Sequence, residues 1–280
     1  MGLLRRHGPI GTACALAAGA VLVAFLLLII VLLAEARPVV DAGFLVDAPS
    51  RFAARAGVGP ALAGTLWIAF LTAAVAFPTG LGTAIFLEEY APRTRLTGAI
   101  ESAIANLAGV PSVVYGVVGL ALFARGLGLG ASIVAGSLTL AALALPTVIV
   151  VSASAIRAVP KGLRVAAHGL GATKWQVIRH QILPAAAPGV LTGCCLAFTR
   201  AMGEAAPLLV IGAAAFVTFA PGAPGDPLTS LPTQIFAWTA RSQEDFSALA
   251  AGACVALLVV LLAMNLVALA VRHRLRGGKR

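Results

Sequence analysis

Six long apolar stretches dominate this chain of 280 residues. A helix needs about 20 apolar residues to cross about 30 Å of hydrocarbon. The sequence therefore predicts an all-α polytopic membrane protein with six transmembrane helices. The predicted spans are residues 10–34, 60–87, 102–124, 126–156, 182–218 and 246–271. With 60% hydrophobic and only 11% charged residues, the chain has more apolar surface than a soluble domain of this size can bury, which excludes a single soluble enzyme.

The first stretch resembles a signal peptide in two respects. Arg5 and Arg6 precede it, and Ala34, Glu35 and Ala36 follow the small-residue pattern of a cleavage site. Its apolar run of 25 residues is longer than the roughly 7–15 residues of a signal-peptide core. We therefore expect a retained first helix.

The distribution of basic residues predicts the orientation. With the N-terminus inside, 14 of the 20 Lys and Arg residues lie in cytoplasmic segments, five lie outside, and Arg200 lies within a span. This excess follows the positive-inside rule, so both termini are expected in the cytoplasm. The net charge of +10 thus reports topology, and we expect no nucleic-acid partner.

The fifth stretch is 37 residues long and carries Arg200 at its middle, followed by Glu204. One interpretation is a hairpin of two short helices that turns at these charges. That interpretation would place the basic tail, residues 272–280, outside, against the positive-inside rule. We therefore favour one long helix, followed by an external segment over residues 219–245 that is built from turns more than from helix.

The segment 157–184 is predicted to form two helices joined by a glycine. Apolar residues at helical spacing precede Gly171, and glycine caps helices in the left-handed conformation without strain. Thr173 and Gln176 then have the spacing of a capping box, which starts a second helix that ends near Pro184. The spacing alone is compatible with an interfacial connector or with a docking element for a soluble partner.

The motif in this segment resembles that of ABC importer permeases, which reads E-A-A, three residues, Gly, nine residues, then I-x-L-P. In this chain it runs from Val165 through Gly171 to Pro184, and Val165 replaces the usual Glu. Further stretches are similar to signatures of the PstA-like permeases of phosphate-specific importers, and within them Ala205 replaces a common Thr. These stretches are residues 106–116, 170–176, 200–209 and 231–238.

The resemblance implies a type I ABC importer permease, with a permease core over residues 60–271, a first helix with flanking segments over 1–59, and a basic tail over 272–280. It implies a bacterial inner-membrane subunit that imports inorganic phosphate by alternating access, surrounded by lipid. Its expected partners are a second homologous permease (PstC-like), two ATPase subunits (PstB-like) and a periplasmic phosphate-binding protein (PstS-like). The residues implied in coupling to the ATPase are Ala166, Ala167, Gly171, Thr173, Leu183 and Pro184.

Arg200 and Glu204 are four residues apart and are expected on one helix face. A guanidinium offers a planar fork of donors that matches phosphate oxygens, and a carboxylate one turn away would ease release. We predict a substrate path at Arg200, Glu204 and Ser112, although the two charges could instead neutralise each other as structural glue. Helix bending is predicted at Pro111, Gly203 and Pro207.

Other functions remain open from the residues alone. They are an importer of another oxyanion (molybdate, tungstate or sulfate) or of a polyamine, an ion-driven secondary carrier, and a membrane scaffold without transport. The chain has no P-loop motif, so we expect ATP and Mg²⁺ to be used by a separate ATPase, with no catalytic residue, metal or cofactor in this chain. The adjacent Glu88 and Glu89 are expected to be solvated surface residues.

Overall fold

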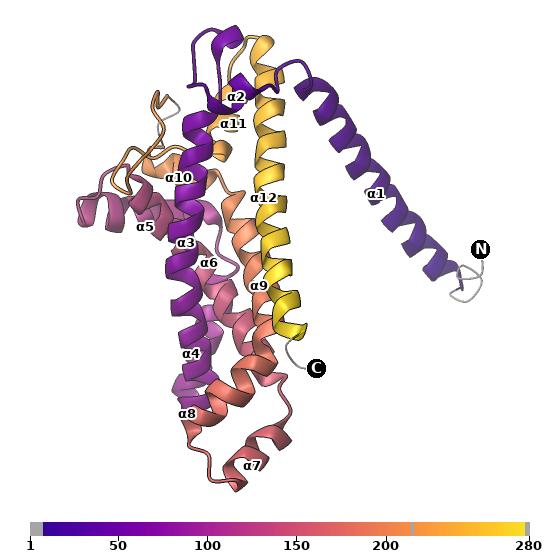
Figure 1. The fold of residues 1–280 in the computed structure, drawn as a ribbon, viewed down its shortest axis with the longest axis vertical. Helices are drawn as coiled ribbons and strands as arrows, with labels where there is room; N and C mark the ends of the chain where they lie inside the picture. The colour runs from indigo at the N-terminus through magenta and orange to yellow at the C-terminus, as the bar shows by residue number, and fades with distance from the viewer. Residues whose placement is uncertain (1–7, 214–215, 278–280) are drawn as a thin grey trace.

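The computed structural model describes residues 8–213 and 216–277, and its regular elements are helical, as predicted (Figure 1). The α-helices are α1 Gly8–Ala36, α2 Ala42–Val46, α3 Gly59–Ile85, α4 Arg95–Leu107, α5 Ser112–Gly119, α6 Ile133–Arg157, α7 Lys161–Gly169, α8 Lys174–Val177, α9 Leu183–Met202, α10 Ala206–Ile211, α11 Leu231–Thr239 and α12 Asp245–Gly277. Short segments of other helix types are η2 Ala53–Arg55 (3₁₀), η3 Phe86–Tyr90, η4 Leu120–Gly126 and η5 Ile178–Ile182 (all π).

Five helical segments in the described part of the chain are long and apolar enough to cross a membrane. A bent pair, α4 with the continuous segment from α5 through η4, brings the number to six when it counts as one span. On that count the prediction of six spans is confirmed. The bundle is elongated, with α2 and α11 at one end and α7 and α8 at the other (Figure 1).

The third predicted span is not one straight helix. α4 ends at Leu107 and α5 begins at Ser112, and the two segments are bent by 101°. Pro111 occupies the cap of α5, and proline both lacks a backbone N–H and disfavours helical geometry in the residue before it.

The start of the fourth predicted span, at residue 126, was placed too early, since α6 begins at Ile133.

The prediction of one long helix over residues 182–218 is wrong at both ends. Helical structure starts at Lys174 and runs through η5 into α9. Pro184 does not end the helix, because the wider π-turn at η5 lies just before it and accommodates its missing N–H. α9 stops at Met202, with Gly203 as its cap. The hairpin alternative is not observed either, since α10 has only six residues. The external segment also differs from the prediction, because α11 is a helix.

Small residues bring the central helices together. α6 lies between α3 and α9 and is the most buried span. A Cβ atom at Gly80 would lie 2.6 Å from Val148, and one at Gly193 would lie 1.7 Å from Val151, so both glycines allow close approach to α6. Lipid provides little hydrophobic drive for helix association, so close packing of this kind stabilises the bundle. α1 contrasts with this core, since most of its residues from Gly11 on are exposed and it diverges from the bundle (Figure 1).

Candidate functional site

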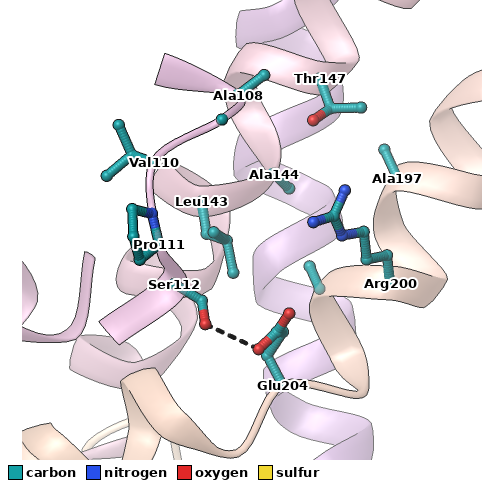
Figure 2. Close-up of a pocket in the computed structure, with 12 residues that line it drawn as sticks. Ala108, Val110, Pro111, Ser112, Leu143, Ala144, Thr147, Ala197, Arg200 and Glu204 are labelled. Atoms are coloured by element: carbon teal, nitrogen blue, oxygen red, sulfur yellow. Dashed lines mark hydrogen bonds between the residues drawn. The ribbon is translucent and has the colours of Figure 1, made fainter. Parts of the chain in front are cut away.

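A cavity of about 200 Å³ lies where α9 ends and the chain breaks between α4 and α5. Figure 2 shows that α6, α9 and the α4–α5 connection contribute its walls. The lining residues are Ala108, Gly109, Val110, Pro111, Ser112, Leu143, Ala144, Thr147, Ala197, Arg200, Ala201 and Glu204. The structure therefore brings together the three residues predicted for the substrate path, from segments about 90 residues apart.

Arg200 supplies the positive charge of the cavity. It lies in the last turn of α9, and its side chain extends toward the side of the cavity formed by Ala144 and Thr147 (Figure 2). Within residues 8–213 and 216–277, no carboxylate lies within 4.0 Å of its guanidinium, and no hydrogen bond to it is formed. A guanidinium without an ion-pair partner in a membrane span is costly unless a ligand or partner chain neutralises it. Its donors are available to bind an anion.

Glu204 does not share a helix face with Arg200, contrary to the prediction. α9 ends before it, and Glu204 lies in the short link to α10. Its Oε2 atom accepts a hydrogen bond of 2.9 Å from the Ser112 hydroxyl at the start of α5 (Figure 2). The carboxylate thus lies beside the first turn of α5. The two charges face one cavity without forming an ion pair. A purely structural role would instead require them to neutralise each other.

The three residues predicted to bend helices lie where helices break. Pro111 caps α5, Gly203 caps α9, and Pro207 lies in the first turn of α10. α10 packs closely on α5, since a Cβ atom at Gly116 would lie 2.8 Å from the Cα of Pro207. The Tyr115 hydroxyl donates a hydrogen bond of 2.9 Å to the Leu107 carbonyl. This bond joins α5 to the end of α4 across the bend.

The predicted helix–glycine–helix arrangement of segment 157–184 is observed, but the prediction that the second helix ends near Pro184 is wrong. α7 is followed by Gly171 in the left-handed conformation (φ +83°), and α8 begins with the capping box of Thr173 and Gln176. In α7, Ala166 is exposed and Ala167 is half-buried. Leu183 and Pro184 lie in the first turn of α9 and not at the end of a separate helix, so this loop is joined to the fifth span without a break.

Among the polar residues that line the cavity, sequence reasoning missed Thr147. Thr147 follows Pro146 inside the α6 span, and a polar residue next to a proline was the only sequence signal for it.

The expectation that Glu88 and Glu89 are solvated is also wrong. Their side chains are only 8% and 11% exposed, and both form ion pairs. The available sequence signal for these ion pairs was the two adjacent acidic residues, together with the basic residues of segment 157–184.

Comparison with known proteins places the chain in a family. A family described as binding-protein-dependent transport system inner membrane component matches residues 76–277. "Probable ABC transporter permease protein YqgI" of Bacillus subtilis (strain 168) is 33% identical over 237 residues, covering 80% of this chain and 81% of that protein. "Phosphate transport system permease protein PstA 1" of Mycobacterium tuberculosis (strain ATCC 25618 / H37Rv) is 34% identical over 224 residues, covering 80% and 71%. These matches confirm the resemblance to PstA-like permeases.

Solved structures agree on the fold. The inward-facing MetNI methionine ABC transporter is similar with a TM-score of 0.62 at 18% identity, covering 77% of this chain and 94% of the matched chain. An amino acid ABC transporter solved with histidines gives a TM-score of 0.52 at 25% identity, covering 75% and 90%. The prediction of a type I importer permease fold is thereby confirmed.

Membership of this family excludes the secondary-carrier and scaffold alternatives, and permease subunits of this kind bind no cofactor of their own. It also implies ATPase and binding-protein partners. The chain therefore belongs to the inner-membrane components of binding-protein-dependent transport systems, as a multi-pass permease subunit of an ABC transporter that is not itself an ATPase.

Proposed function

We propose that this chain is a permease subunit of an importer that moves inorganic phosphate into the cytoplasm by alternating access. The observation that carries the proposal is the Arg200 guanidinium, which faces a cavity and has no ion-pair partner in the described part of the chain. The names of several relatives, including PstA 1 of Mycobacterium tuberculosis, support phosphate as the substrate.

The cavity suits an oxyanion that still carries a proton. Arg200 offers paired donors to two oxygens of the anion. An ionised carboxylate only accepts hydrogen bonds, and one oxygen of Glu204 already accepts from Ser112. Glu204 repels anions on balance, but hydrogen phosphate retains a P–OH donor at neutral pH that offsets part of this repulsion, whereas sulfate and molybdate have no proton to donate. This difference favours phosphate over the other oxyanions.

The assembly is completed by other chains. A second homologous permease closes the path, and a periplasmic phosphate-binding protein delivers the anion at the end of the bundle that carries α2 and α11. Two ATPase subunits engage the segment of α7 and α8 at the opposite end (Figure 1).

ATP binding moves this segment and hydrolysis returns it to its starting position, with Gly171 as the joint between α7 and α8. Both termini then lie in the cytoplasm, as the distribution of basic residues predicts.

The central test is ATP-driven phosphate uptake by the complete complex in proteoliposomes. Arg200→Ala is expected to lower uptake about 100-fold, because a charge-assisted anion site is lost. Arg125→Ala is the matched control, since Arg125 is exposed and does not line the cavity. Arsenate, which also carries a proton, should compete with phosphate, whereas sulfate and molybdate should not. Unchanged uptake in an assembled Arg200→Ala complex would remove Arg200 from the path, and transport of molybdate instead of phosphate would overturn the substrate assignment.

The orientation has its own test. Single cysteines placed at Arg241 and at Arg95, in a variant without the four native cysteines, should react with a membrane-impermeant reagent from opposite sides. Arg241 is expected to label from the periplasm and Arg95 only after the membrane is opened. The reverse pattern would contradict the proposed topology.

A further inference from the structure

α7 is attached to the bundle mainly by polar contacts. None of its residues is buried, and its large apolar side chains, Leu163 and Val165, are 41% and 71% exposed. Ala167 is half-buried, and Arg164 is the charged residue of this helix that turns back toward the bundle, with a side chain only 22% exposed. A helix without buried apolar side chains gains little positional restraint from packing, so its polar contacts fix its place.

The Arg164 guanidinium joins three segments. Its Nη1 and Nη2 atoms donate to the carbonyls of Val159 (2.7 Å) and Ile156 (3.0 Å), at the end of α6. Its Nε and Nη2 atoms both donate to Oε1 of Glu89 in η3, at 3.2 Å and 2.9 Å. η3 continues α3 without interruption, so α7, α6 and α3 meet at this one side chain.

Two neighbouring contacts also end on η3. Arg157, at the end of α6, donates from Nε and Nη2 to the Glu88 carboxylate and lies 3.8 Å from Glu101 of α4. The Lys174 ammonium, at the start of α8, lies 4.8 Å from the centre of the Tyr90 ring. Three consecutive residues of η3 therefore receive side chains from α6, α7 and α8 in turn. Forked arginine–carboxylate contacts fix orientation as well as distance, which a single packed methyl group cannot do.

The helices joined at this point lead to the cavity. α6 carries Thr147 and Ala144 in the cavity wall, and α3 packs along α6. A displacement of α7 that pulls on Arg164 thus acts on both helices at once, whereas an unattached α7 could move without moving them.

We propose that Glu89 receives the motion of α7 through Arg164, and that this ion pair passes the motion to α3 and α6. Arg164 and Glu89 are positioning residues that act through these helices and do not touch the substrate. The inference rests on the proposed function, because it assumes that ATP-dependent movement of α7 opens and closes the cavity.

A double-mutant cycle in the complete reconstituted complex tests the ion pair. ATP hydrolysis and phosphate uptake are measured together for wild type, Glu89→Gln, Arg164→Gln and the double variant. Glu89→Gln keeps the size of the side chain and is expected to leave hydrolysis within about twofold but to lower phosphate moved per ATP about tenfold. Because the two residues act as one unit, adding Glu89→Gln to Arg164→Gln should change this ratio by less than about twofold. Arg95→Gln, an exposed residue at the start of α4, is the control and should keep the wild-type ratio.

The outcomes separate this inference from the proposed function. If the wild-type complex moves no phosphate with ATP, the proposed function fails. If wild type transports and Glu89→Gln keeps the wild-type ratio, or if the two effects multiply in the double variant, only the ion-pair inference is overturned. Should Glu89→Gln fail to assemble, Arg164→Lys provides the test, since it keeps the charge but loses the fork. Its ratio should fall between those of wild type and Arg164→Gln, and a wild-type ratio would contradict the inference.

Discussion

The cavity beside α9 and the charged contacts around η3 are built from the same residue types in opposite arrangements. In the cavity, Arg200 and Glu204 share one space without contacting each other. Around η3, Glu88 and Glu89 each have an arginine within ion-pair distance. Arginine and glutamate therefore do not define a role by their presence, and their pairing distinguishes the two regions.

The difference has a physical reason. A guanidinium that is already paired gains little from a further anion, because its charge and its donors are occupied. The paired side chains around η3 are suited to holding helices in register. Arg200 has no ion-pair partner in the described part of the chain, so its donors remain available, at the expense of an unfavourable charge in a membrane span. The proposed function therefore assigns anion binding to the cavity, and the η3 contacts hold helices together.

Reversal of the charge at Arg200 should give the largest effect. Arg200→Glu is expected to lower phosphate uptake by more than about 100-fold, which corresponds to about 3 kcal/mol of lost anion stabilisation. The melting temperature of the purified complex should fall by no more than about 2 °C, because no carboxylate of the described chain loses a partner. A large fall in melting temperature would mean that Arg200 is structural, and the contrast between the regions would break.

Removal of an arginine from the η3 region should have the opposite profile. Arg157→Ala leaves the 8% exposed Glu88 carboxylate without its donors, which is expected to cost about 1–3 kcal/mol of stability. Thermal or denaturant unfolding in detergent measures this cost, and Arg95→Ala on exposed surface is the control. If the stability of Arg157→Ala equals that of Arg95→Ala, the η3 contacts do not hold helices together.

A backbone substitution in the segment that links α7 to α8 should have a smaller effect. Gly171 has φ +83°, a conformation that L-residues adopt at a cost of about 1 kcal/mol. Gly171→Ala is therefore expected to destabilise this segment by about that amount, seen as faster proteolysis between α7 and α8. Gly162→Ala is the matched control, because Gly162 lies inside α7 with open space around it and alanine favours helix there. Equal proteolysis of the two variants would contradict the strained conformation.

Neutralisation of Glu204 should have the smallest effect and the most specific one. Glu204→Gln keeps an oxygen that can accept from Ser112 but removes the negative charge from the cavity. Phosphate should then bind more tightly and leave more slowly, so KM and the maximal uptake rate should both fall by a few-fold, equivalent to about 1 kcal/mol. A rise in KM would show that Glu204 helps to bind the anion and does not promote its release.

Local signals in the sequence were sufficient for much of the fold. Apolar length predicts the spans, and the capping box at Thr173 with the glycine at position 171 predicts the two helices of segment 157–184. Apolar length fails where helices break inside membrane-compatible sequence. The stop after Met202 and the bend before Ser112 lie within continuous apolar stretches, and hydropathy carries no information on such breaks.

The sequence by itself therefore determined the solvent of this protein, the number of its spans and the residues available for the cavity, because hydropathy, turn chemistry and charge placement are local properties. Tertiary structure decided which charges meet. In the folded chain Glu204 accepts a hydrogen bond from Ser112 and does not pair with Arg200, and Glu89 pairs with Arg164, 75 residues away. Such partners depend on how helices pack around α6, and packing is fixed by contacts between segments that no local pattern records.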